Sequence, residues 1–290
     1  MSHELAAAVS SWYAEAARDL PWRRPDATPW GVLVSEVMLQ QTPVVRVLPA
    51  YQAWLARWPR PADLAADSPG AAVRMWGKLG YPRRALRLHA CAQALGERFD
   101  GAVPCDVDDL ESLPGIGSYT ARAVAVFAFG GRHAVVDTNV RRVVARAALG
   151  QGDAGPPSNR RDLAAVEALL PDDPRAAARA SIGFMELGAL VCTAREPRCG
   201  QCPVQDSCAW VTAGRPEYAG PTVRPQRFAG TDRQVRGLLM DVLRESHGSV
   251  ERAALNVVWH DRVQRERALA ALLADGLVTE QPDGSYALPS

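Results

Sequence analysis

The sequence has almost no lysine. Lys78 is the only lysine among 33 basic residues in a chain of 290, and all the others are arginines. The preference for arginine is typical of a GC-rich coding sequence. It also limits the possible mechanisms, because Schiff-base chemistry usually needs a lysine amine as the nucleophile. Lys78 is therefore the only lysine available for such a step.

Long apolar runs are missing as well. No stretch approaches the ~20 uninterrupted apolar residues that a membrane span needs, and residues 1–5 lack the basic head of a signal peptide. We therefore expect a cytoplasmic protein without a membrane partner. With 48% hydrophobic and 22% charged residues, the composition is that of a folded globular protein. The net charge of +1 neither predicts nor excludes a polyanionic partner.

Sustained period-two alternation is absent from residues 1–220, and apolar residues recur there at helical spacing. The pattern predicts an all-α unit whose helices are joined by short loops rich in proline and glycine. The predicted helices are Leu5–Arg18, Val32–Gln41, Val44–Trp58, Ala71–Trp76, Arg83–Arg98, Ser118–Phe129, Val140–Leu149, Asp162–Leu170 and Ala176–Val191.

The last part of the chain has a different pattern. Residues 214–230 contain a proline-rich stretch that is typical of a linker. Beyond it, helices are predicted at 233–244, 252–256 and 262–275, followed by a β-hairpin over 277–288. This order predicts a small winged-helix-like α+β domain over residues 231–290. Its nine acidic and seven basic residues do not favour a DNA-binding wing.

Four of the six cysteines fall within seventeen residues, at Cys192, Cys199, Cys202 and Cys208. Structural zinc sites usually join two C-x2-C pairs from a distance, and here only Cys199 and Cys202 form such a pair. Thiolates spread over one compact loop suit a cuboidal iron–sulfur cluster, in which each sulfur binds a different iron. The spacing favours a [4Fe-4S] cluster, with zinc as the alternative.

A glycine-containing turn precedes one predicted helix. It runs from Leu113 to Thr120 and contains Gly115 and Gly117 just before Ser118. Backbone N–H groups at such a helix start can bind a phosphate without reading a base. A plain turn between helices is the alternative. An excess of basic residues over 74–98, and four more arginines over 132–146, favours phosphate binding.

Two carboxylates stand alone in apolar surroundings. Glu36 lies in the run Val32–Leu39, and Asp137 follows Ala134–Val136. Burial raises the pKa of a carboxyl group, which suits a general acid near neutral pH. The alternatives are a structural salt bridge for Glu36 and a helix N-cap for Asp137.

Together these motifs resemble the helix–hairpin–helix DNA glycosylases with an iron–sulfur loop, and among them the MutY-type adenine glycosylases. The likeness covers residues 20–210. The run Ser35 to Thr42, S-E-V-M-L-Q-Q-T, is the most diagnostic part. The other matching motifs are Leu20-Pro21-Trp22-Arg23, Leu79-Gly80-Tyr81, Leu113 to Thr120, Val136 to Val140, and Glu186 to Cys192.

The resemblance implies a fold and its domains. Residues 28–135 would form a six-helix domain with the helix–hairpin–helix, and residues 1–27 with 136–213 a cluster domain. Residues 214–230 would be the linker and 231–290 the C-terminal domain. Family members usually carry a β-rich, MutT-like reader of 8-oxoguanine after the linker, and the present C-terminal pattern differs from it.

The resemblance also implies an activity: excision of adenine opposite 8-oxoguanine or guanine in double-stranded DNA, by a nucleoid-associated monomer. Glu36 would protonate the departing adenine, and Asp137 would stabilise the oxocarbenium-like sugar, directly or through a transient adduct. The remaining residues would orient these groups and contact DNA. They are Tyr119 and Asn139 beside Asp137, with Glu186 in the same pocket; Arg23 at the adenine; Gln41, Thr42, Leu79 and Tyr81 in the duplex; and Gly115, Gly117 and Ser118 at a phosphate.

Tyr119 stands where the endonuclease III branch has a nucleophilic lysine, so the resemblance implies a monofunctional enzyme that leaves an abasic site. Pro82 departs from the family, which usually has a second tyrosine there. Two other functions stay open at this stage. One is a mismatch thymine glycosylase of the same superfamily, and the other is a non-catalytic iron–sulfur DNA-binding regulator.

Overall fold

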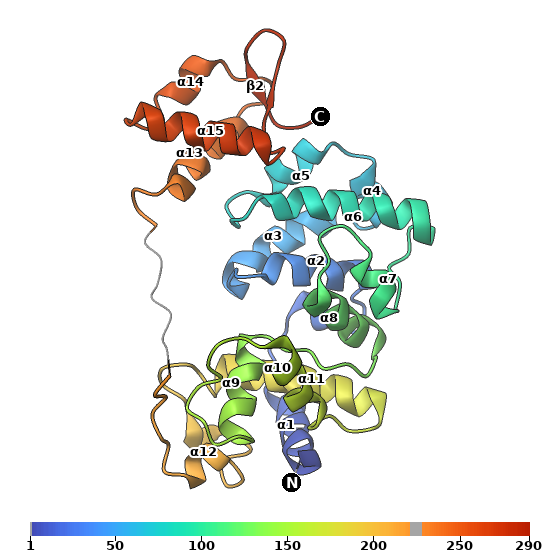
Figure 1. Cartoon of the computed structure of the whole chain (residues 1–290). Coiled ribbons are helices and arrows are strands. Elements are labelled where there is room, and N and C mark those ends of the chain that lie inside the picture. Colours follow the sequence, from blue (N-terminus) through green and yellow to red (C-terminus); the bar gives the residue numbers. More distant parts are fainter. Residues whose placement is uncertain (1, 221–227) are drawn as a thin grey trace. The chain divides into compact units, whose positions relative to one another are not determined.

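The computed structural model describes residues 2–220 and 228–290, and the regular secondary structure in these ranges is almost wholly helical (Figure 1). None of the helices in these ranges is long and apolar enough to cross a membrane. In chain order, the α-helices of the described residues are α1 (Ser2–Ala16), α2 (Pro29–Leu39), α3 (Val44–Arg57), α4 (Pro61–Ala65), α5 (Pro69–Trp76), α6 (Arg83–Phe99), α7 (Val107–Glu111), α8 (Ser118–Phe129), α9 (Thr138–Ala147), α10 (Asn159–Glu167), α11 (Pro174–Leu190), α12 (Ala209–Thr212), α13 (Asp232–Glu245), α14 (Arg252–Asn256) and α15 (Arg262–Ala274).

Two 3₁₀ turns and one small sheet complete the described structure. The turns are η1 (Pro21–Arg23) and η2 (Cys199–Gln201), and strand β1 (Thr279–Glu280) pairs antiparallel with β2 (Tyr286–Ala287). The predicted all-α class with a small C-terminal α+β domain is confirmed. The described residues group into two compact units, which are taken separately below. The first draws on residues 2–32, 105–111 and 117–220, and the second on 33–104, 112–116 and 228–290.

In the first unit, α11 packs against both α1 and α9 (Figure 1). Val9, Val144 and Phe184 from these three helices are each at most 3% exposed. The start of α9 lies so close to α11 that a Cβ added to Gly188 would sit 2.6 Å from the Cβ of Asn139. Only glycine leaves room for this approach. The segment that carries Asp137 and Asn139 is therefore seated directly on the core of this unit.

In the second unit, α6 packs against α4 and α5. The core is built on tryptophans: the Trp54 ring lies edge-on to Trp58 at 4.6 Å and to Trp76 at 5.8 Å between centroids. All three are at most 2% exposed. This aromatic core fixes the end of α5, from which the turn over residues 77–82 leads into α6.

The C-terminal domain belongs to this second unit. Its α13 packs against α15, and Val250 forms an isolated antiparallel bridge with Tyr286 beside the β1–β2 pair. The domain is held against α5 by backbone and side-chain hydrogen bonds. Gly70 N donates to Pro289 O at 2.7 Å, and Arg244 Nε donates to Val73 O at 3.2 Å.

Candidate active site

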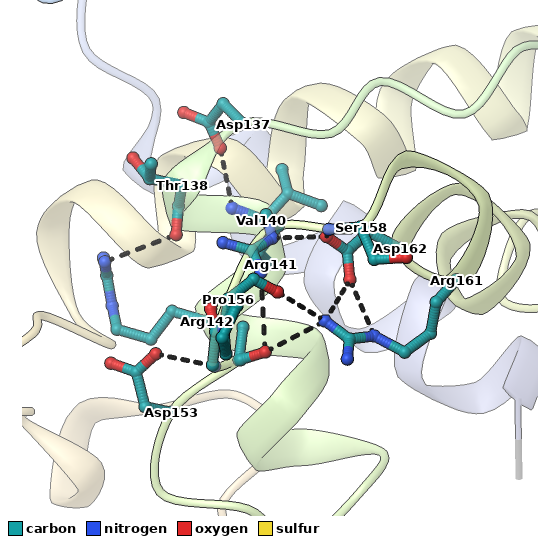
Figure 2. A network of polar contacts seen from close by, with 12 residues as sticks. Asp137, Thr138, Val140, Arg141, Arg142, Asp153, Pro156, Ser158, Arg161 and Asp162 are labelled. Atoms are coloured by element: carbon teal, nitrogen blue, oxygen red, sulfur yellow. Dashed lines mark hydrogen bonds and ion pairs between the residues drawn. The ribbon is translucent and has the colours of Figure 1, made fainter. Parts of the chain in front are cut away.

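Asp137 caps the N-terminus of α9. Its Oδ1 accepts a hydrogen bond of 2.7 Å from the backbone N–H of Val140, and its Oδ2 accepts one of 2.8 Å from Asn139 Nδ2. Figure 2 shows the contact with Val140 at the start of the helix. Burial raises the pKa of Asp137, and the hydrogen bonds from Val140 and Asn139 offset part of that effect. The carboxylate is thus desolvated but held in one orientation by two donors.

Asn139 is itself held by Arg142, one of the arginines that the sequence pattern placed near a phosphate. Arg142 Nη2 donates to Asn139 Oδ1 at 2.8 Å and to Gly188 O at 2.6 Å, and Arg142 Nε donates to Cys192 O at 2.7 Å. One guanidinium therefore links the side chain beside Asp137 to the first cysteine of the loop. Its position three residues after Asn139, on the same helix, was the only available sequence signal.

Tyr119 lies in the first turn of α8, in the same unit as Asp137. It packs against a small buried cluster formed by Ala123, Val126, Val135 and Ala178. Val135 precedes Asp137 by two residues, so the structure brings the Tyr119 ring to the segment that leads into the carboxylate. The tyrosine is partly exposed, as a residue must be if it is to contact a ligand.

Glu186 is fully buried in the first unit and is held by two arginines. Arg18 binds both carboxylate oxygens, with Nε–Oε1 at 2.8 Å and Nη2–Oε2 at 2.6 Å, and Arg23 Nη1 lies 2.9 Å from Oε2. Burial raises the pKa of Glu186, but these partners outweigh it and the net pKa is below the ordinary value. Glu186 and Arg23 are thus brought together, through an ion pair that also recruits Arg18. Sequence reasoning missed Arg18.

Glu36 belongs to the second unit and projects from the middle of α2. Its side chain is 5% exposed, between Ser35 at 0% and Val37 at 4%. The helix that carries it is apolar on nearly all sides, so the carboxyl group is enclosed by the core. Hydrophobic neighbours in the sequence had predicted this burial.

Gln41, Thr42, Leu79 and Tyr81 lie together in the second unit, on two loops. Thr42 Oγ1 donates to Leu79 O at 3.3 Å, which joins the loop after α2 to the loop after α5. Gln41 and Tyr81 are exposed, whereas Thr42 and Leu79 are each 6% exposed. Two of the four residues can therefore reach a ligand directly, and the other two support them.

The glycine-containing turn leads into α8, as predicted, and the short helix α7 precedes it. Gly115 has a φ of 80°, and a Cβ at this position would lie 2.6 Å from the Cβ of Arg87. Gly117 is the N-cap of α8, and Ser118 is its first residue. Both the left-handed backbone and the close approach of Arg87 require glycine at position 115.

The four cysteines line a single pocket in the first unit, together with Arg146 and Trp210. Arg146 is 5% exposed; it donates to Cys192 Sγ at 3.5 Å and to Thr193 O at 2.7 Å, and it lies 4.7 Å from the Trp210 ring centroid. Burial raises the pKa of Cys202 to about 11, so an electropositive group is needed to keep such a thiol ionised. Four soft ligands around one partly enclosed space fit a [4Fe-4S] cluster.

The four arginines after the turn were predicted to line a phosphate backbone, and in the structure each of them also has partners within the protein. Arg132 pairs with Glu167, and Arg141 lies 2.6 Å from Asp162. Arg142 and Arg146 donate to backbone carbonyls of the core and of the cysteine loop. Carbonyl groups in irregular loops need donors, and in this unit arginine side chains supply them.

Comparisons with known proteins agree with this geometry. Residues 34–167 match the model of the HhH-GPD superfamily base excision DNA repair proteins, and residues 192–208 match the iron–sulfur binding domain of endonuclease III. An adenine DNA glycosylase of Mycobacterium tuberculosis is 57% identical over 280 residues, which cover 96% of this chain and 91% of that protein. One from Mycolicibacterium smegmatis is 58% identical over 96% of this chain and 94% of its own length.

A solved structure with a similar fold is that of a thermostable thymine-DNA glycosylase. It superposes with a TM-score of 0.65 over 73% of this chain and 97% of that one, at 25% sequence identity. The predicted helix–hairpin–helix glycosylase fold is therefore confirmed. The predicted iron–sulfur loop is confirmed as well, by the match over residues 192–208.

Proposed function

This chain belongs to the adenine DNA glycosylases of the helix–hairpin–helix base excision repair family, and on that premise we propose that it removes adenine lying opposite 8-oxoguanine or guanine. It acts on DNA, and the bond that breaks is the N-glycosidic bond of the adenine nucleotide. This bond is out of reach inside a stacked duplex, so the nucleotide is first extruded into a pocket. The product is an abasic site.

Glu36 acts as the general acid. As the glycosidic bond breaks, its electron pair goes to the adenine, and a proton from the Glu36 carboxyl neutralises the leaving base at N7. The support is the burial of this side chain, 5% exposed in an apolar helix. A desolvated carboxyl group is suited to giving up a proton near neutral pH.

Asp137 stabilises the positive charge that develops on the sugar as adenine departs. Water then attacks C1′ and loses a proton, which completes the hydrolysis. The observation that carries this mechanism is the clamped carboxylate: Asn139 and the Val140 amide hold both oxygens of Asp137 at 2.7–2.8 Å. A preorganised carboxylate needs no reorientation when the charge develops. Tyr119 and Asn139 orient this group and the sugar.

The enzyme is monofunctional, because no lysine is available at the reacting carbon. Tyr119 stands where the endonuclease III branch has its lysine, and Lys78, the one lysine of the chain, has a partner of its own in the second unit. There its Nζ lies 3.3 Å from Asp241 Oδ2 of the C-terminal domain. A phenol cannot form the Schiff base that leads to strand cleavage.

The remaining predicted residues bind the duplex and the extruded base. Exposed Gln41 and Tyr81 enter the duplex at the vacated position and at the opposite base, supported by Thr42 and Leu79. Arg23 contacts the adenine, and the buried Glu186, 2.9 Å from the Arg23 guanidinium, holds that guanidinium in place. Gly115, Gly117 and Ser118 bind one phosphate through the start of α8. Cys192, Cys199, Cys202 and Cys208 would hold a [4Fe-4S] cluster, and such a cluster would fasten the loop that Arg142 and Arg146 contact.

The test is base release from four duplexes that carry A opposite 8-oxoguanine, A opposite G, A opposite C, or T opposite G. Adenine release, with strand breaks only after alkali, is the expected result. Release of thymine would favour a mismatch thymine glycosylase, and breaks without alkali would contradict the monofunctional assignment. A Glu36→Gln variant that keeps duplex binding but releases no base separates this enzyme from a DNA-binding regulator. Sedimentation with and without duplex tests the further proposal that it acts as a monomer.

A further inference from the structure

Two of the residues proposed to enter the duplex have a left-handed backbone. Gln41 has a φ of 55° and Tyr81 a φ of 47°, and neither is glycine. A side chain in this region is unfavourable and persists only where the surrounding structure fixes it. Both residues are exposed, so the groups that fix their conformations must act through the neighbouring backbone.

The guanidinium of Arg84 reaches the backbone next to both Gln41 and Tyr81. Arg84 Nη1 donates to Gln40 O at 2.7 Å, and Arg84 Nη2 donates to Gly80 O at 3.0 Å. These carbonyls belong to the residues directly before Gln41 and Tyr81. Each bond therefore fixes the peptide plane from which a left-handed residue departs.

The other contacts of Arg84 link the same two loops to the end of α2. Its Nη1 also donates to Val37 O at 2.8 Å and to Met38 O at 3.0 Å, at the end of the helix that carries Glu36. Its Nη2 also donates to Thr42 Oγ1 at 3.0 Å. All five acceptors are carbonyl or hydroxyl oxygens, and a planar fork of donors is suited to holding several of them at once.

The side chain is enclosed and cannot itself reach DNA. Arg84 is 7% exposed, and its Cζ lies 5.0 Å from the Trp76 ring centroid and 5.5 Å from that of Tyr81. Burial lowers its pKa to about 10, which still leaves the group charged at neutral pH. The Tyr81 ring therefore rests on a fixed cation while the rest of its surface faces solvent.

We propose that Arg84 is a positioning residue that fixes Gln41 and Tyr81 relative to each other, so that both side chains enter the duplex together. This inference rests on the proposed function, because it assumes that both residues enter the duplex. Arg84 thereby has a part in base extrusion that the other basic residues over 74–98 do not have. Arg87, three residues later, is exposed and covers Gly115 instead.

The first test replaces Arg84 by lysine, which keeps the charge but loses the fork. The readouts are the fluorescence of a 2-aminopurine next to the target adenine, the affinity for an undamaged duplex and the single-turnover rate of adenine release. We expect extrusion and rate to fall by ~10-fold or more, because small displacements of positioning groups cost up to ~10²-fold. Affinity for the undamaged duplex stays within about twofold, since phosphate contacts are unchanged.

Arg141→Lys is the matched control. Arg141 is a similarly enclosed, multidentate arginine in the other unit, bound to Asp162 at 2.6 Å and to Gly155 O at 3.0 Å (Figure 2). It should lose stability without losing extrusion. An Arg84→Lys protein that melts at a lower temperature but extrudes and releases adenine like the wild type would show that Arg84 has only a structural role.

A double-mutant cycle tests the same idea with Arg84 intact, in case the lysine variant does not fold. Gln41→Ala and Tyr81→Ala alter exposed side chains, and a shared support predicts that their effects on extrusion are not additive. Additive effects of the two substitutions on extrusion would show that Gln41 and Tyr81 do not act together, which would overturn the proposal. A wild-type protein that releases no base at all would instead overturn the proposed function, so the two failures are distinguishable.

Discussion

The guanidinium of Arg142 lies 2.8 Å from the amide oxygen of Asn139, and the amide nitrogen of Asn139 lies 2.8 Å from Asp137. The chain of contacts continues on the other side, because Arg142 Nε also binds Cys192 O at 2.7 Å. A single side chain thus joins the carboxylate proposed for catalysis to the loop that carries the iron–sulfur cluster. The geometry of one is thereby tied to the geometry of the other.

Replacing Arg142 by glutamine should lower adenine release more than it lowers cluster content. The variant leaves Asn139 free to rotate away from Asp137, and we expect a loss of about 10- to 100-fold in single-turnover rate, the range for misplaced positioning groups. Iron content and visible absorbance should stay close to those of the wild type, because all four cysteines remain. Loss of the cluster in parallel with the rate would contradict this explanation.

Replacing Asp137 by asparagine should abolish base release without destabilising the fold at neutral pH. Burial raises the folded-state pKa of Asp137, so its contribution to stability is fully present below the unfolded pKa and is lost as pH rises through the folded pKa. Asparagine carries no charge and is a good N-cap, so the free energy of unfolding near pH 7 should be equal to that of the wild type or higher.

Two comparisons, both measured by chemical denaturation, check the direction of this change in the free energy of unfolding. Asp137→Ala loses the cap and should unfold about 1 kcal/mol more easily than the asparagine variant. The advantage of asparagine over aspartate should shrink as pH falls, because the wild-type carboxyl group becomes protonated. An asparagine variant that is less stable than the wild type by the same amount at every pH would contradict the argument.

Removing Asn139 should move the acid limb of the pH–rate profile. Its hydrogen bond favours the ionised form of Asp137, so Asn139→Ala should raise the pKa of Asp137 further. Base release that needs the ionised carboxylate then declines at a higher pH than in the wild type. Single-turnover rates across the acid range provide the measurement, and the exposed neighbour Thr138→Ala is the control. An unshifted limb would mean that Asn139 does not tune this carboxylate.

Much of the fold could be predicted from periodicity. Helix α8 has the predicted bounds, Ser118–Phe129, and most other long helices begin or end within a few residues of the predicted positions. The short helices α4 and α7 were missed, because five residues are too few to show a period. Pro61 is the first residue of α4, where its fixed φ favours a helix start.

The candidate site could be predicted only in part. Motifs pointed to the cysteines and to both carboxylates, but not to the internal partners of Arg142 and Arg146, which hold Asn139 and the cysteine loop. A charged residue does not reveal from sequence whether it meets a phosphate or a buried carbonyl. For Arg84 a signal existed: it shares the helical stripe of buried Leu88, Cys91 and Leu95, which is a core position. Such a stripe predicts burial even for a cation.

Removing one cysteine of the pocket should unfold its loop. Cys202→Ala deprives the cluster of one ligand, and the loss of a metal centre is among the changes that cost about 4 kcal/mol or more. Arg146 alone, through Thr193 O and Ala194 O, holds only the first part of the loop. Thermal melting and iron content measure the effect. Cys105→Ser is the control, because Cys105 is exposed and lies outside the pocket; if both variants kept iron equally, Cys202 would not be a ligand.

Replacing Arg244 by leucine should loosen the C-terminal domain from α5. The two arginines at this contact cap each other's helices: Arg74 donates to Arg244 O and Ser246 O, and Arg244 donates to Val73 O at 3.2 Å. The Arg244 side chain is only 11% exposed, so its loss leaves the Val73 carbonyl without this donor in an enclosed contact, at about 1–3 kcal/mol. Limited proteolysis should release a fragment with residues 231–290 sooner than from the wild type.

Arg267→Leu is the control, since Arg267 is 59% exposed and pairs with Asp232 inside the same domain. Exposed ion pairs of this kind contribute about 0.2–1 kcal/mol. Equal release from both variants would mean that Arg244 does not fasten this domain.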